Sequence, residues 1–143
     1  MKKRISIVIF FAVFLTVTMI LTAGCITLGH QESPMDLWVL KTDSNGSMEW
    51  MTIIADDPNN RGEKIIQTSD GGYAIAGTGT DVRQNGPVPF IFRLDKNGHI
   101  LPTISMGKSP DYGSSIAMAP DNGYVVASYS GILFRVNENG TVL

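Results

Sequence analysis

The chain of 143 residues has a single cysteine, Cys25, and two histidines, His30 and His99. One cysteine excludes a disulfide within the chain, and after Cys25 nothing remains for a thiolate metal site or a cysteine nucleophile. His30 lies in a short polar stretch and His99 beside an Asn-Gly pair, without a partner at the spacing of a metal site or a catalytic triad. The sequence therefore predicts no catalytic residue, no metal and no cofactor.

Basic residues are scarce beyond the N-terminus. The whole chain has 11 Lys and Arg against 13 Asp and Glu, and three of the basic residues are Lys2, Lys3 and Arg4. Without these three, 8 basic residues face 13 acidic ones, a net charge of −5. Because no basic cluster remains, the composition argues against nucleic acid as a partner.

The first 25 residues have the pattern of an export signal. The basic residues precede an uncharged run, Ile5–Gly24, and small residues then lead into Cys25. A basic start, an apolar segment and small residues before a cleavage point are the three parts of a secretory signal. We expect residues 1–24 to be a signal peptide, residues 25–35 a tether and residues 36–143 the folded domain.

The run Leu21-Thr22-Ala23-Gly24-Cys25 resembles the lipobox of bacterial and archaeal lipoproteins, with Thr22 where the lipobox more often has Leu. The resemblance implies cleavage between Gly24 and Cys25 and a lipid on the Cys25 thiol. The alternative is an uncleaved N-terminal anchor helix, because the uncharged, mostly apolar run of 20 residues at about 1.5 Å each spans a hydrocarbon core of about 30 Å. Both interpretations place the folded domain at the extracytoplasmic face of the cell membrane.

Two sequence elements recur in the folded domain. Residues 43–46 (Asp-Ser-Asn-Gly) return at 95–98 (Asp-Lys-Asn-Gly) and at 137–140 (Asn-Glu-Asn-Gly), with glycine spacings of 52 and 42. Residues 62–76 also align without a gap with residues 113–127, at an offset of 51. Two anchors at nearly one spacing indicate a repeated structural unit.

Each unit has the pattern of short strands joined by tight turns. Asn-Gly and Asp-Gly pairs between apolar runs are strong hairpin signals, and we expect type I′ turns because Asn and Gly tolerate positive φ. Frequent glycines argue against helices after residue 35. The predicted strands are 37–40, 48–54, 64–67, 73–77, 90–94, 99–104, 116–118, 124–128 and 132–136.

Four short strands in a unit of about 40 to 50 residues are typical of a β-propeller blade. The segment Thr68–Tyr73 resembles tandem repeats of secreted and surface β-propeller proteins of archaea and bacteria. Asp43-x-Asn45-Gly46-x-x-x-Trp50 is similar to the tryptophan-docking motif of quinoprotein-type propellers, although Pro102 stands at the equivalent place in the second copy. The resemblance implies an all-β fold, a partial β-propeller of about two to two and a half four-stranded antiparallel blades.

A closed propeller needs at least about four blades, more than these residues supply. Three outcomes stay open. The chain is a truncated copy of a longer propeller protein, which we favour, or it folds as an open twisted pair of sheets, or several copies close one ring. Exposed blade edges favour self-association because they carry unpaired backbone groups.

Alternate connections of an antiparallel meander lie at opposite ends, so the tight turns should share one end and the longer loops the other. Binding residues concentrate on such loops, although a plain solvated loop has the same composition. The predicted ligand face consists of Asp57, Arg61, Asp81, Arg83, Asp111 and Tyr112.

Asn45-Gly46-Ser47 and Asn139-Gly140-Thr141 fit the N-glycosylation pattern, so Asn45 and Asn139 are candidate modification sites. We expect a non-catalytic, membrane-tethered extracellular module for binding, adhesion or envelope structure, with an unknown extracellular protein or glycan as its partner. The alternative is a remnant or subunit of a quinoprotein-like propeller dehydrogenase, supported only by the Trp50 motif.

The lipoprotein interpretation predicts that Cys25 carries the lipid. In cells fed a radioactive lipid precursor, the wild-type chain should become labelled and Cys25→Ser should not, because the variant lacks the acceptor thiol. Autoradiography of the immunoprecipitated chain measures this. Equal labelling of both proteins would rule out Cys25 as the lipid site.

Overall fold

The computed structural model describes residues 8–9, 36–55, 60–81 and 83–143. This part of the chain contains strands and no helix, so it holds no helix that could cross a membrane. The predicted all-β class is confirmed. The strands are β1 (Val8–Ile9), β2 (Leu37–Thr42), β3 (Met48–Ile54), β4 (Arg61–Gln67), β5 (Tyr73–Asp81), β6 (Gly86–Leu94), β7 (Ile100–Ser105), β8 (Gly113–Met118), β9 (Tyr124–Ser128) and β10 (Leu133–Val136).

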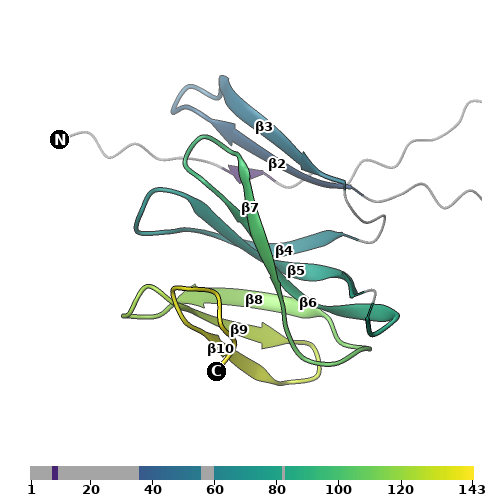
Figure 1. Ribbon diagram of the computed structural model, residues 1–143. Coiled ribbons are helices and arrows are strands. Elements are labelled where there is room, and N and C mark those ends of the chain that lie inside the picture. The colour runs from purple at the N-terminus through teal and green to yellow at the C-terminus, as the bar shows by residue number, and fades with distance from the viewer. Residues whose placement is uncertain (1–7, 10–35, 56–59, 82) are drawn as a thin grey trace, which may run out of the picture.

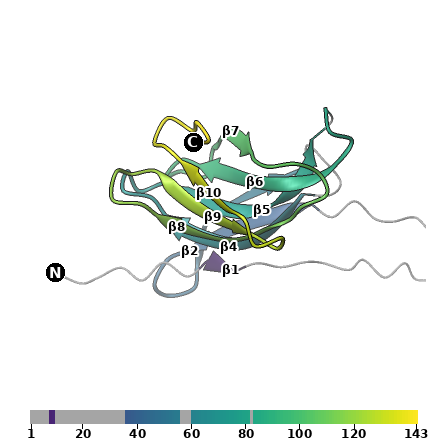
Figure 2. The ribbon, with the colours of Figure 1, turned by 90° about the horizontal axis from the view of Figure 1, so that it is seen from below.

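The strands form three antiparallel sheets that follow the chain order. The first sheet is β1-β2-β3, the middle sheet is β4-β5-β6-β7 and the third sheet has the order β10-β9-β8. The middle sheet lies between the other two (Figure 1). Seen at right angles to that view, β8, β9 and β10 follow the same order as β4, β5 and β6 (Figure 2). The described residues thus form a stack of three sheets and show no closed ring.

Hydrophobic residues on both faces of the middle sheet hold the stack together. On β5, Tyr73 and Ile75 belong to the cluster shared with the first sheet. Ala74 and Ala76 belong to the cluster shared with the third sheet. This alternation follows from the period of two along a strand. Bulky side chains therefore face one neighbour and small ones the other.

The predicted strands lie where expected, but several are longer. The ranges 48–54 and 124–128 match β3 and β9, whereas β5 continues past Gly77 to Asp81. Gly77 lies inside β5 and close against β4, because a Cβ at this position would overlap the Arg61 carbonyl oxygen. Gly77, the last residue of the predicted strand, is thus a point of close backbone approach inside a sheet.

The tight turns differ from the predicted type I′. In the turn after β2, Gly46 N–H donates to the Asp43 carbonyl at 3.2 Å and Asp43 N–H donates to the Ser47 carbonyl at 2.9 Å. Only the last residue of the turn has positive φ, +85° at Gly46, while Asn45 does not. This is a type I turn followed by a glycine bulge. The Asp43 carboxylate also accepts the backbone N–H groups of Asn45 and Ser47, which stabilises this form.

Trp50 of β3 packs onto the turn between β6 and β7. A Cβ on Gly98 would lie 2.7 Å from the Trp50 ring, and the Thr52 hydroxyl donates to the Gly98 carbonyl. The Trp50 ring also meets the edge of Tyr73, with 5.5 Å between centroids. Trp50 Nε1 and the Tyr73 hydroxyl are buried without a hydrogen-bond partner among the described residues, so shape and dispersion hold this contact.

The same turn of the third sheet is covered in the same way. Gly140 lies under Ile104 of β7, whose Cδ1 would be 3.1 Å from an added Cβ. Pro102 is the repeat equivalent of Trp50, and here Ile104 covers the glycine of the turn in place of a tryptophan ring. The turn of the first sheet has no such cover among the described residues, none of which lies within 4 Å of a Cβ built on Gly46.

Val8 and Ile9 fall within the predicted signal segment and form β1, which pairs with β2 through Val8–Lys41 and Ile9–Leu40. Residues 10–35, including Gly24 and Cys25, lie outside the described residues. The signal or anchor helix, the cleavage site and the lipidation of Cys25 stay predictions.

Gly98 and Gly46 form a matched pair for testing the Trp50 contact. Both have φ near +85°, so alanine should cost about 1–2 kcal/mol of unfolding free energy at either position. Only at Gly98 does the new methyl group meet a ring, which adds about 1–3 kcal/mol of overpacking. Urea unfolding of Gly98→Ala and Gly46→Ala measures the difference, and equal losses would contradict the docking contact.

Candidate functional site

The connections separate into two ends of the stack, as predicted. The turns after β2, β4, β6, β8 and β10 lie at the left in Figure 1, and the described parts of the loops after β5, β7 and β9 lie at the right. The antiparallel order of each sheet produces this separation. We call these the turn end and the loop end.

At the loop end, Asp81 closes β5 and is buried. Its carboxylate accepts the Arg83 backbone N–H at 2.9 Å and two bonds from the Arg83 guanidinium, at 3.1 and 2.9 Å. These bonds lower the pKa of Asp81 from 3.8 to about 2. The carboxylate is therefore ionised and fully engaged in ordering its own loop. Arg83 is exposed and also reaches the Ser105 hydroxyl at 3.4 Å.

Asp111 is likewise buried at the loop end, between β7 and β8. Its carboxylate accepts the Ser130 hydroxyl at 2.8 Å and the Tyr112 backbone N–H at 2.8 Å. Burial alone would raise the pKa of Asp111, but the hydrogen bonds from Ser130, Ser128 and the backbone outweigh it and leave the pKa lowered. Asp111 ties the loop after β7 to the loop after β9.

The predicted ligand face thus contains two structural acids and three exposed side chains. Arg61 is exposed and pairs with Glu63 at 3.0 Å, and Tyr112 is exposed beside Asp111. Asp57 lies outside the described residues. Asp111 N–H donates to the Pro87 carbonyl at 3.0 Å, so both acid clusters belong to one end of the stack. Binding by Arg61, Arg83 and Tyr112 stays a prediction.

A pocket that the sequence did not indicate lies at the turn end, between the middle and third sheets. Its volume is about 240 Å³. It is lined by residues from three turns and four strands: Thr68, Ser69, Asp70, Tyr73, Arg93, Leu94, Leu101, Asn122, Tyr124 and Glu138. None of the five predicted ligand-face residues that the structure describes lines it.

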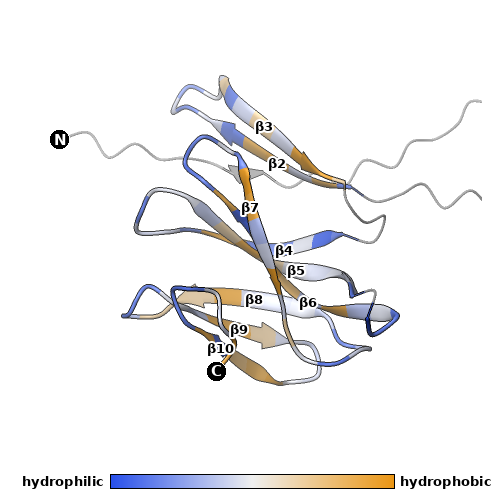
Figure 3. Cartoon of the chain, in the orientation of Figure 1, coloured by the Kyte–Doolittle hydropathy of each residue, from blue (hydrophilic) through white to orange (hydrophobic). Residues whose placement is uncertain are grey.

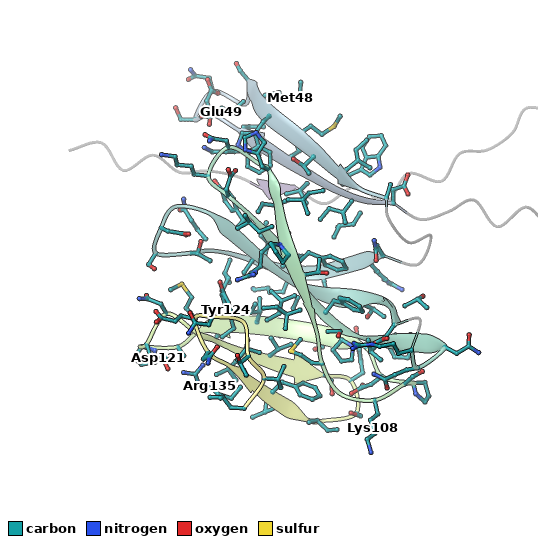
Figure 4. The ribbon with its side chains drawn as sticks, viewed as in Figure 1. Met48, Glu49, Lys108, Asp121, Tyr124 and Arg135 are labelled. Atoms are coloured by element: carbon teal, nitrogen blue, oxygen red, sulfur yellow. The ribbon has the colours of Figure 1, made fainter. Side chains whose placement is uncertain are left out.

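The pocket includes two residues of the middle sheet, Asp70 and Arg93, whose equivalents in the third sheet form an ion pair. There the guanidinium of Arg135 pairs with Asp121 and also donates to the Tyr124 carbonyl at 3.2 Å. The three labelled side chains Asp121, Tyr124 and Arg135 lie near one another at the turn end of this sheet, opposite Lys108 at the loop end (Figure 4). By the repeat spacings, Asp121 corresponds to Asp70 and Arg135 to Arg93.

In the middle sheet the equivalent residues, Arg93 and Asp70, do not form an ion pair; we call this pair open. Among the described residues no ion pair joins Arg93 to Asp70, and Arg93 Nε instead donates to the Pro102 carbonyl at 3.1 Å. The Thr68 hydroxyl, the Gly72 N–H and, more weakly, the charge of Arg93 lower the pKa of Asp70. A cation and an ionised acid therefore share one small pocket without neutralising each other directly.

The pocket combines groups that bind polar, hydroxyl-bearing molecules. Carboxylates of Asp70 and Glu138 accept hydrogen bonds, and the Arg93 guanidinium donates them. Thr68 and Tyr124 add hydroxyl and aromatic surface. The repeat alignment already equates Arg93 with Arg135, but it does not reveal that one pair is open, because the third sheet completes the pocket.

The other candidate residues lie on the surface. Asn45 and Asn139 are exposed in turns, where an N-glycosylation acceptor must be, and their modification stays a prediction. His99 is exposed, with Nδ1 2.8 Å from the Asp95 carboxylate. Within the described ranges, no group of three or more His, Cys, Asp or Glu is placed to hold a metal ion.

No protein-family model matches the chain, and no curated protein matches its sequence. Among solved structures, it is similar to a crystal structure of a protein of unknown function from Bacteroides caccae, with a TM-score of 0.53 and 14% identity. The match covers 76% of this chain and 39% of that one, so the chain spans well under half of its length. At this identity the likeness shows the fold alone.

The Asp81–Arg83 pair predicts a pH dependence of stability. The folded pKa of about 2 lies below the value of about 3.9 in an unfolded chain. The pair therefore stabilises the fold fully above pH of about 4 and loses its effect as the pH falls through about 2. Asp81→Asn and Arg83→Ala should each lower the thermal midpoint at pH 7 and flatten its decline below about pH 4. Arg61→Ala should keep the wild-type decline, and an unchanged decline in both loop variants would contradict this assignment.

Proposed function

We propose that the chain is a non-catalytic, membrane-tethered extracellular module of propeller-type blades, and that the pocket between its middle and third sheets binds glycan. The observation that carries the proposal is the open Arg93–Asp70 pair in that pocket, where the equivalent Arg135–Asp121 pair is closed. Because Arg93 and Asp70 line the pocket without forming an ion pair with each other, their charged groups are available to an external ligand.

Repeated contacts between sheets support the propeller interpretation. Trp50 of the first sheet covers Gly98 of the middle sheet, and Ile104 of the middle sheet covers Gly140 of the third. The four-stranded middle sheet has the strand number and meander order of a propeller blade. Radial repetition of such a unit would use the same contact at every step.

The size and chemistry of the pocket favour a sugar. Its volume of about 240 Å³ is below the roughly 300–1,000 Å³ of sites for drug-sized ligands. Two carboxylates, a guanidinium and hydroxyl groups can each pair with ring hydroxyls, and the Tyr124 ring offers an apolar surface. One or two sugar rings at the end of a larger glycan fit this combination.

The location at the membrane rests on the predicted signal and lipobox. An 11-residue tether, residues 25–35, can extend by at most about 40 Å. A module held this close to the membrane would meet glycans or proteins of the cell envelope. Rigid sheets with short turns suit such a role because the pocket keeps its shape when the tether moves.

The dehydrogenase alternative has one specific support, the Trp50 motif. The contact of Trp50 with Gly98 explains the motif as a packing device between sheets. The same contact serves a binding module and an enzyme equally well, so it favours neither activity. The binding module is our first proposal because the open charged pair is an additional feature that packing does not require.

The pocket assignment predicts which substitutions abolish glycan binding. Arg93→Ala and Asp70→Asn should each weaken binding by about tenfold or more, since a hydrogen bond to a charged group contributes about 1.5–3 kcal/mol. A screen of the purified full chain against soluble oligosaccharides identifies the ligand, and titration calorimetry measures the loss. Lys108→Ala is the matched control and should bind like wild type, because Lys108 is exposed at the loop end and belongs neither to the pocket nor to the predicted ligand face.

If Arg61→Ala and Arg83→Ala lost binding while the pocket variants kept it, the ligand site would lie at the loop end instead. If no oligosaccharide bound the wild-type chain, glycan recognition would be excluded for the ligands screened, and the fold assignment would stand.

A further inference from the structure

The repeat relates each face of the outer sheets to a face of the middle sheet. In a strand pair, residues directly opposite share one face of the sheet. Equivalent residues of the repeat should therefore meet equivalent surroundings. In the stack, however, the first and third sheets each have one face that no other described sheet covers.

The uncovered face of the third sheet matches the covered face of β5 and β6. Val125 and Ala127 correspond to Ala74 and Ala76, which pack against the third sheet. Leu133 is opposite Ala127 and corresponds to Ile91, another member of that cluster. Leu133 is 70% exposed, whereas Ile91 is fully buried. The third sheet thus presents outward the surface that the middle sheet buries.

The uncovered face of the first sheet matches the opposite face of the middle sheet. Trp38 and Leu40 correspond to Phe90 and Phe92, which pack against the first sheet. Ile53 is opposite Trp38, and both are exposed, at 42% and 37%. Hydrophobic stretches are visible on β2, β3, β9 and β10 (Figure 3). This face therefore lacks the partner that its equivalent has.

The turn at Gly46 also indicates that the first sheet lacks a neighbour, and this observation is independent of the exposed faces. Gly98 and Gly140 are each covered by a side chain of the preceding sheet, whereas at the equivalent Gly46 no residue in the described part of the chain lies within 4 Å of an added Cβ. A preceding sheet would cover Gly46 and the outer face of the first sheet together.

We propose that the outer face of the third sheet docks onto the outer face of the first sheet of a second copy of this chain, head to tail. The proposal rests on the propeller-type architecture proposed above and is independent of the glycan pocket. Two copies present six sheets, within the range of about four to eight blades of closed propellers. This heterologous contact joins faces, as in the ring of several copies that the sequence leaves open and unlike pairing through blade edges, and it closes when the second copy's third sheet returns to the first copy.

Two substitutions, each of which disables one face, test the proposal. Ile53→Glu blocks the first-sheet face and Leu133→Glu the third-sheet face, and both residues are exposed, so the fold should tolerate the change. Light scattering of the full chain in mild detergent should give twice the mass of one chain for wild type and the mass of one chain for either variant. Ile100→Glu is the matched control on β7, 50% exposed and on neither outer face, and should behave like wild type.

Mixing the variants shows whether the contact is head to tail. A copy with Ile53→Glu keeps its third-sheet face, and a copy with Leu133→Glu keeps its first-sheet face. With one variant labelled with ¹⁵N, native mass spectrometry of the mixture should detect particles that contain one copy of each. A symmetric contact would instead be lost in only one variant and would not be rescued by mixing.

A wild-type chain with the mass of one copy would overturn the proposal, and so would an assembly that neither or only one substitution disrupts. These results are separate from the glycan test. A single-copy chain that still binds oligosaccharide would leave the binding proposal intact, and a two-copy particle that binds none would leave the assembly proposal intact.

Discussion

Face-to-face packing of antiparallel sheets is the interaction on which the rest of this structure depends. No disulfide can form within the chain and no metal cluster lies among the described residues, so the two clusters on either side of β5 must hold the stack. Tyr73 and Ile75 fill one interface, and Ala74 and Ala76 permit a closer approach at the other. Each interface brings together turns that are far apart in the sequence, and the pocket forms at one of these junctions.

The strand pattern could be predicted from the sequence because its signals are local. Turn residues between apolar runs locate β3 and β9 to the residue, and the alignment of 62–76 with 113–127 predicts that the two hairpins are alike. The predicted type I′ turn was wrong. The Asp43 carboxylate accepts the backbone N–H groups of Asn45 and Ser47, and this contact favours a type I turn in which only Gly46 has positive φ. Composition indicates a turn, while the side-chain contacts decide its geometry.

The candidate site could not be predicted in the same way, because it depends on the distance between sheets. The acids at the loop end have the composition of a binding surface, yet Asp81 and Asp111 are occupied by Arg83 and Ser130. At the turn end, Arg93 and Arg135 occupy equivalent positions. Arg93 lines a pocket because the third sheet packs beside it, whereas Arg135 pairs with Asp121. Equivalent sequence thus leads to different surroundings at the end of a stack.

The glycine under Trp50 and the glycine under Ile104 show that one contact tolerates different side chains, provided that a bulky group covers a turn without a Cβ. This tolerance has an evolutionary consequence. A duplication that inserted another unit of about 50 residues would bring compatible surfaces on both sides from the moment it arose. Lineages could therefore lengthen or shorten such a chain by whole units, with selection acting afterwards on individual side chains.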